Sequence, residues 1–148
     1  MKPAAVSEDT VVQEITIRGS AERIFTALTD PRQLATWWGV EGRFQARQAE
    51  CDVRPGGKWR MSVEAPIGSG RFTVVSGEYV TIDRPHLLVY TWLRENFPES
   101  VVRWDLEESG GETRVRLTHS GLTPEAARVH TGWPMILSML KAYVEPAK

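Results

Sequence analysis

The sequence predicts an α+β protein in which an antiparallel sheet packs against a long C-terminal helix. Between residues 42 and 120, short stretches that alternate apolar and polar residues are separated by turn-forming residues, which is typical of consecutive antiparallel strands. Between Thr123 and Val144, apolar residues recur at steps of three and four, which is the period of a helix. A sheet with one apolar face needs a cover, and this helix is the obvious one.

The length and composition favour one globular domain. A chain of 148 residues buries roughly 68–70% of the surface that its unfolded form exposes, which is enough for a core without metals or disulfides. We expect residues 1–9 to be a flexible tail and residues 10–148 to form the domain. Charged residues make up 25% of the chain and the net charge is −1, so charge gives no reason to expect nucleic acid or an anionic membrane as a partner.

Other features are those of a cytoplasmic protein. Cys51 is the only cysteine, so no disulfide can form within the chain, which fits a reducing compartment. The N-terminal residues lack the apolar core of a signal peptide, and no apolar run approaches the roughly 18–20 residues of a membrane helix. We therefore expect a cytoplasmic location and no insertion into a membrane.

The N-terminal part predicts one strand followed by two short helices. Apolar residues alternate with polar ones over residues 11–18, which is the period of a strand. Ser20 suits the N-cap of a helix that extends to Thr29, and Asp30 suits the N-cap of a second short helix that ends at Gly39.

Six further strands are predicted because stretches rich in β-branched and aromatic residues lie between turn residues. Alternate side chains of a strand share a face, so Trp59, Trp92 and Trp104 are expected on the inner face of the sheet. Gly77 indicates a bulge or a bend. The six strands cover residues 44–53, 58–65, 72–83, 86–94, 100–108 and 112–120.

The C-terminal helix is predicted from Thr123, a suitable N-cap, to Val144. Within it, Gly132 and Pro134 flank Trp133, and a proline cannot donate the backbone hydrogen bond to the carbonyl four residues earlier. We expect a kink or break there, which separates a short segment at the mouth of the fold from a main helix that begins near Pro134.

Short motifs follow one another in a characteristic order. They are Ala21–Leu28, Asp30-Pro31, Trp37-Trp38-Gly39, Gly56-Gly57-Lys58-Trp59, Gly77-Glu78-Tyr79, Leu88–Trp92, Thr118–Leu122 and Gly132-Trp133. Their order and spacing resemble the START/Bet v 1-like (SRPBCC) superfamily, and within it the branch related to the C-terminal domain of the activator of Hsp90 ATPase. The resemblance covers about residues 11–145.

The resemblance implies a helix-grip fold, in which a strongly curved antiparallel sheet of about six to seven strands wraps around the C-terminal helix, with two short helices after the first strand. A cavity then opens between sheet and helix. Members bind lipids, sterols, polyketides or other apolar compounds, and some are cyclases or hydrolases. This branch shares no catalytic triad or metal motif, so no catalytic residue is implied. The Hsp90 activator also has a separate chaperone-binding domain, for which this chain has no room, so chaperone contact is not the favoured function.

The cavity that the resemblance implies would be lined by inward-facing aromatic and apolar side chains, a composition that ligand sites for apolar molecules have. The same residues also suit a filled core, and the sequence alone leaves both interpretations open. The predicted ligand-binding residues are Trp37, Trp38, Trp59, Met61, Tyr90, Trp92, Trp104, His119, Trp133, Ile136, Met139 and Leu140.

His119 is the candidate acid–base group, because it lies on the predicted inner face and an imidazole titrates near neutrality. A histidine in such a place is also commonly a hydrogen-bonded core residue. Glu78 is expected to face water, since a carboxylate in an apolar cavity needs a partner. The three histidines and Cys51 show no metal-binding spacing, so neither a metal nor a cofactor is predicted.

The first functional hypothesis is non-catalytic binding of a small, largely apolar molecule of aromatic, polyketide or lipid type. One alternative is a cyclase or hydrolase that uses the same cavity, with His119, Glu78 or Tyr90 as acid–base groups. Another is a protein-interaction module of the Hsp90-activator kind, which predicts an exposed apolar patch. The protein is expected to be a monomer or a homodimer.

Overall fold

The structure, a computed structural model, describes residues 6–7, 10–95, 97–123 and 132–145. In these ranges the strands form one antiparallel sheet in the order β1-β2-β9-β8-β7-β6-β5-β4-β3. The strands are β1 (Val6–Ser7), β2 (Thr10–Arg18), β3 (Gly39–Val40), β4 (Phe44–Cys51), β5 (Lys58–Glu64), β6 (Phe72–Asp83), β7 (Leu87–Arg94), β8 (Ser100–Ser109) and β9 (Glu112–Ser120). The helices are α1 (Ala21–Thr29), α2 (Pro31–Trp37) and α4 (Trp133–Val144).

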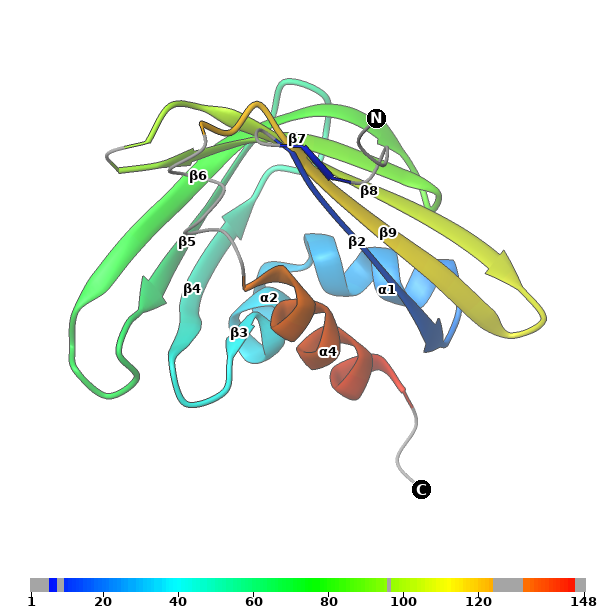
Figure 1. Ribbon diagram of the computed structural model, residues 1–148, viewed down its shortest axis with the longest axis horizontal. Coiled ribbons are helices and arrows are strands. Elements are labelled where there is room, and N and C mark those ends of the chain that lie inside the picture. Colours follow the sequence, from blue (N-terminus) through cyan, green and yellow to red (C-terminus); the bar gives the residue numbers. More distant parts are fainter. Residues whose placement is uncertain (1–5, 8–9, 96, 124–131, 146–148) are drawn as a thin grey trace.

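The sheet curves into an arch that holds the helices α1, α2 and α4 on its concave side (Figure 1). One arm of the arch contains β4, β5 and β6, and the other contains β2, β8 and β9. The helix α4 packs against β2 and β3, and α2 packs against β4. This arrangement confirms the predicted fold class, in which a curved antiparallel sheet wraps around a C-terminal helix and two short helices follow the first long strand.

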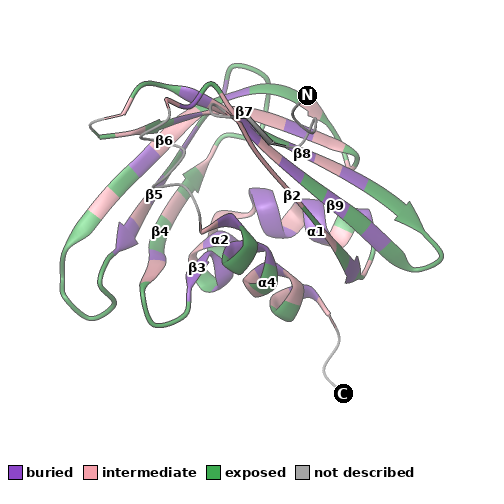
Figure 2. Ribbon diagram, viewed as in Figure 1, coloured by how far each residue is buried: buried purple, intermediate pink, exposed green. Residues whose placement is uncertain are grey.

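The core lies on the concave face, where the predicted alternation of side chains is confirmed. Along β8 the buried residues Val102, Trp104 and Leu106 alternate with more exposed ones. The strand β9 repeats the pattern, with Val115 and Leu117 fully buried. Figure 2 shows this alternation of buried and exposed positions along β9. Burial of this face supplies most of the favourable free energy of folding, at roughly 25 cal/mol per Å² of apolar surface.

The number of strands is higher than the predicted six to seven. The seven strands with seven or more residues are the predicted ones, and β1 and β3 are added, each with two residues. A two-residue strand carries no alternation that a sequence pattern could reveal. β1 lies inside the segment predicted as a flexible tail, where Val6 pairs with Val11 of β2. The rest of residues 1–9 falls outside the described part of the chain.

The caps of the two short helices are confirmed. The hydroxyl of Ser20 accepts a hydrogen bond from the backbone N–H of Arg23 at 3.0 Å. The carboxylate of Asp30 accepts one from the backbone N–H of Arg32 at 2.9 Å. Each bond satisfies a backbone donor that the helix itself leaves without a partner.

The helix α4 begins at Trp133, with Gly132 as its N-cap and Pro134 in its first turn. The predicted main helix starting near Pro134 is therefore confirmed, while residues 124–131 of the predicted longer helix lie outside the described residues. A proline is favourable in a first turn because the backbone donor that it lacks has no helical partner there. The buried face comprises Trp133, Ile136, Leu137, Leu140 and Val144. Among the described helices, none is long and apolar enough to cross a membrane.

The sequence suggested a bulge or a bend at Gly77, but the bulge of β6 lies further along the strand. The change of register falls between Tyr79 and Thr81, so the extra residue of β6 is Val80. Gly77 pairs regularly with Trp59, and the Trp59 indole reaches over it to donate to the carbonyl of Thr91 at 3.2 Å. A Cβ atom at Gly77 would collide with that same carbonyl oxygen and lie 2.6 Å from the indole nitrogen. The glycine therefore makes room for a side chain of the neighbouring strand.

We expect Gly77→Ala to lower the free energy of unfolding by about 1–3 kcal/mol, because the added methyl group overpacks the sheet. Urea unfolding followed by circular dichroism measures this loss. Ser76→Ala, on the adjacent position of the same strand, is the matched control and should stay within about 0.5 kcal/mol of the wild type. A Gly77→Ala variant as stable as this control would contradict the proposed role of the glycine.

Candidate ligand-binding pocket

A pocket of about 310 Å³ lies between the first turn of α4 and the concave face of the sheet. The strands β4 and β6 begin at this end of the sheet, and β5 and β7 finish there, because neighbouring strands are antiparallel. The side chains and backbone that line the pocket belong to Trp38, Val40, Arg43, Phe44, Val63, Ala65, Thr73, Val75, Trp92, Arg94, Gly132, Trp133, Met135 and Ile136.

Three tryptophans from different elements form the inner wall of the pocket. Trp38 follows α2, Trp92 lies on β7 and Trp133 opens α4. The ring centroids of Trp38 and Trp92 are 6.1 Å apart, those of Trp92 and Trp133 are 5.7 Å apart, and those of Trp38 and Trp133 are 6.4 Å apart. Tilted and edge-to-face contacts at such distances favour a rigid aromatic surface.

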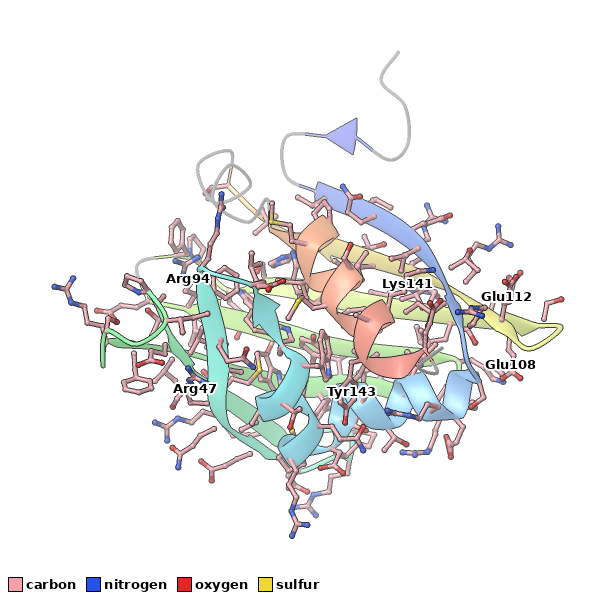
Figure 3. The ribbon with its side chains drawn as sticks, turned by 90° about the horizontal axis from the view of Figure 1, so that it is seen from below. Arg47, Arg94, Glu108, Glu112, Lys141 and Tyr143 are labelled. Atoms are coloured by element: carbon pink, nitrogen blue, oxygen red, sulfur yellow. The ribbon has the colours of Figure 1, made fainter. Side chains whose placement is uncertain are left out.

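The outer rim of the pocket is more polar and more exposed. Arg43 comes from the turn between β3 and β4 and is exposed, while Arg94 ends β7 and is half-buried. The guanidinium of Arg94 lies 5.4 Å from the centre of the Phe97 ring. Met135, on the first turn of α4, is 49% exposed and supplies a flexible apolar side chain at the opening. Figure 3 shows Arg94 toward the opposite end of the molecule from Glu108 and Glu112.

The loop between β5 and β6 also borders the pocket, and Glu64 holds its two ends together. One carboxylate oxygen accepts a hydrogen bond from the backbone N–H of Gly70 at 3.0 Å, and the other accepts one from Arg47 at 3.0 Å. Bonds from the backbone of Gly68 and Gly70 and from Arg47 lower the pKa of Glu64. The ionised carboxylate therefore ties the loop down and fixes the place of Ala65 on the pocket wall.

The structure places four of the twelve predicted site residues on the pocket wall, namely Trp38, Trp92, Trp133 and Ile136. The others belong to the core or pack against it, away from this lining. They are Trp37, Trp59, Met61, Tyr90, Trp104, His119, Met139 and Leu140.

An aromatic cluster explains why part of the concave face is filled. The ring centroids of Trp59 and Tyr90 are 5.0 Å apart, and the Trp104 indole donates a hydrogen bond to the Tyr90 hydroxyl at 3.0 Å. Burial raises the pKa of Tyr90 above its ordinary value, and it does the same for the neighbouring Tyr79. Both phenols are therefore neutral near pH 7 and serve as packing and hydrogen-bonding groups.

His119 is fully buried behind the tryptophan wall, and both of its ring nitrogens have partners. The Trp133 indole donates to Nδ1 at 3.1 Å, and Nε2 lies 2.7 Å from the hydroxyl oxygen of Ser100. An indole can only donate, so Nδ1 must accept and the proton of the neutral ring must be on Nε2. Nε2 then donates to Ser100, and His119 joins α4 to two strands of the sheet.

Residues that sequence analysis did not assign to the site form most of the lining. The alternation of side chains along a strand could have identified several of them. Val63 lies on the same face of its strand as Trp59, and Arg94 lies on the same face as Trp92. No comparable signal marked Arg43, which lies in a turn. The unassigned lining residues are Val40, Arg43, Phe44, Val63, Ala65, Thr73, Val75, Arg94, Gly132 and Met135.

Two further expectations concern charged groups. Glu78 is exposed, as predicted, and its backbone N–H donates to the Thr91 hydroxyl at 2.8 Å. Within the described ranges, no three histidine, cysteine, aspartate or glutamate side chains gather closely enough to hold a metal ion.

The outer, convex face carries exposed apolar side chains on β6 and β7. Phe72, Val74 and Leu93 are 55%, 40% and 45% exposed. Phe72 and Val74 lie on one side of β6, and Leu93 pairs with Ser76, two residues further along that strand. The three side chains, called the convex patch below, therefore lie near one another on the face opposite the pocket.

We expect His119→Ala to lower the free energy of unfolding by roughly 2–4 kcal/mol, because it leaves a cavity and deprives the buried Trp133 N–H of its acceptor. Urea unfolding followed by tryptophan fluorescence measures the change. His86→Ala removes an exposed histidine and should unfold like the wild type. Equal stability of the two variants would show that His119 does not anchor α4.

Comparisons with known proteins agree with this architecture. A crystal structure from Chromobacterium violaceum superimposes with a TM-score of 0.82 and 26% sequence identity, over 94% of this chain and 99% of that one. A crystal structure from Nitrosomonas europaea gives 0.80 and 19%, over 93% and 95%. The solution structure of an AHSA1-like protein from Aeromonas hydrophila gives 0.77 and 23%, over 91% of each chain. No curated protein matches the sequence.

The family comparison covers most of the chain. Residues 18–145 match the family model described as activator of Hsp90 ATPase homolog 1-like protein. This range extends from the end of β2 to the residue after α4, so it contains every element that lines the pocket. The protein belongs to the family of activator of Hsp90 ATPase homolog 1-like (AHSA1-like) proteins.

Proposed function

We propose that the protein binds a small, largely apolar molecule in the pocket between the sheet and the first turn of α4, without catalysing a reaction on it. The observation that carries this proposal is the open space of about 310 Å³ beside a wall of three tryptophans. Pockets for small molecules typically have volumes of roughly 300–1,000 Å³ and an apolar lining with a few polar groups. The volume is at the lower end of that range, which favours a compact ligand.

The free energy of binding would come mainly from burial of apolar surface. The surface that a ligand would newly bury belongs mainly to the more exposed lining residues Phe44, Thr73 and Met135. The tryptophans of the inner wall are already almost completely buried by their neighbours, so their rings need little further ordering. A rigid wall lowers the entropic cost of association. Met135 at the opening can change its rotamer to suit ligands of different shape.

The chemistry of the lining supports binding rather than catalysis. Among the described residues, no histidine, carboxylate or cysteine lines the pocket. General acid–base catalysis needs a titratable group within hydrogen-bond reach of the reacting atoms. His119, the candidate for a cyclase or hydrolase, lies behind Trp92 and Trp133 and uses both ring nitrogens in the hydrogen bonds described above.

Filling the pocket with a side chain should abolish binding. Thr73 lines the pocket and the next residue, Val74, points to the convex face, so Thr73→Trp and Val74→Trp place the same bulky group on opposite sides of the sheet. We expect a neutral aromatic probe such as flavone to quench the tryptophan fluorescence of the wild type. Calorimetric titration should show at least about a tenfold weaker affinity for Thr73→Trp and an unchanged affinity for Val74→Trp. The proposal would be refuted if the two variants bound flavone with equal affinity. It would also be refuted if the wild type bound neither flavone nor any polyketide or fatty acid.

A second candidate function is a protein-interaction module, and the convex patch favours it. Its three exposed apolar side chains are adjacent, and clustered apolar surface often marks an interaction site. The measurement that decides is the ATPase rate of a purified Hsp90 with and without this protein. An increase that Phe72→Ser removes would support this function, and an unchanged rate would reject Hsp90 activation.

A further inference from the structure

Two arginines lie at the mouth of an otherwise apolar pocket. Arg43 precedes β4 and Arg94 ends β7, and the strands β5 and β6 lie between these two elements in the sheet. The two side chains therefore approach the opening from different sides. Among the residues that the structure describes, the remaining lining consists of apolar and aromatic residues, together with one threonine and one glycine.

Most of the other arginines that the structure describes form ion pairs, whereas Arg43 and Arg94, like Arg23, Arg32 and Arg71, form none with a described carboxylate. Eight arginines form ion pairs with carboxylates in the part of the chain that the structure describes, and neither Arg43 nor Arg94 is among them. Glu108 and Glu112 lie toward the opposite end of the molecule from Arg94 (Figure 3). The net charge of the chain is −1, so the positive charge at the pocket mouth is a local feature.

The surroundings of the two guanidinium groups suit an anion that arrives with an apolar body. A guanidinium keeps its charge at all physiological pH values and offers paired N–H donors that match a carboxylate or a phosphate. Apolar walls exclude water from one side of the opening, which strengthens the attraction between opposite charges. The ring of Phe97 packs against the Arg94 guanidinium and limits the positions that it can take.

We propose that the ligand is an apolar organic acid, whose body lies against the tryptophan wall while its anionic group is held at the mouth by Arg43 and Arg94. This inference rests on the proposed function, because it names the class of molecule that the same pocket takes. It also assigns two binding residues, one from the β3–β4 turn and one from the end of β7. Carboxylates and phosphate monoesters share the required chemistry.

Three naphthalene probes of similar size separate the apolar contribution from the ionic one. Naphthalene-2-carboxylate and 2-naphthyl phosphate carry an anion, and naphthalene-2-carboxamide is their neutral counterpart. Isothermal titration calorimetry at low salt gives the affinity of each probe for the wild type, Arg43→Gln, Arg94→Gln and the double variant. Arg60→Gln removes the same charge from the convex side of the sheet and is the matched control. Thermal unfolding checks that each variant is folded.

We expect at least one of the acids to bind the wild type about tenfold more tightly than the amide, since a charge-assisted hydrogen bond adds to the apolar contribution. Each single substitution should reduce this preference, and the double variant should lose it while its affinity for the amide stays unchanged. The preference should also fall as salt is added. Arg60→Gln should bind all three probes like the wild type.

The opposite results are equally clear. Equal affinity of the wild type for the acids and the amide would overturn the assignment of an acid and leave the proposed apolar pocket intact. The assignment would also be overturned if Arg60→Gln reduced the preference for the acids as much as Arg43→Gln and Arg94→Gln do. The preference would then depend on the net charge of the protein and not on the two arginines at the pocket. A wild type that binds none of the probes, together with the negative result for flavone, would remove the proposed function and this inference with it.

Discussion

The hydrogen bond from Trp133 to His119 determines how the C-terminal helix meets the sheet. It joins the first residue of α4 to β9, and the contact of His119 with Ser100 continues the connection into β8. The Ser100 hydroxyl also reaches the carbonyl of Trp92 on β7 at 3.4 Å. A buried polar network of this kind is stable only when its members find partners, so it permits few alternative positions of the helix. The inner wall of the pocket follows from that one placement.

In the part of the chain that the structure describes, the concave face is filled with side chains at one end and borders the pocket at the other. At one end, Trp59, Tyr90 and Trp104 fill the space with rings in direct contact. At the other end, the first turn of α4 and residues near the ends of β4, β5, β6 and β7 line the pocket. The two interpretations of the inward-facing aromatic residues, a filled core and a cavity, therefore hold for different parts of the same surface.

Strand parity and helix period were sufficient to predict the elements and the α+β class, because both depend on local spacing alone, whereas the curvature of the sheet around the helix was implied by the resemblance to the family. They placed Trp104, Leu117 and His119 in the interior, and Pro134 located the start of the main helix. The site was less accessible to sequence analysis. Whether an inward-facing residue contacts another ring or an open space depends on where elements distant in the sequence end. From the sequence, Trp59 and Trp92 were therefore equivalent candidates, but only Trp92 lines the pocket. Arg43 belongs to a turn, where no periodicity indicates direction.

The two shortest strands have a consequence for how the molecule behaves in a crowded solution. A sheet edge with free backbone groups can pair with a strand of another chain and so begin aggregation. Here β1 and β3 are the outermost strands and contribute only two residues each, while α4 packs against β2 and α2 packs against β4. On β2, Lys141 also donates a hydrogen bond to the carbonyl of Thr16, and Glu145 accepts one from the backbone N–H of Arg18. These backbone groups are therefore not available for pairing with a strand of another chain.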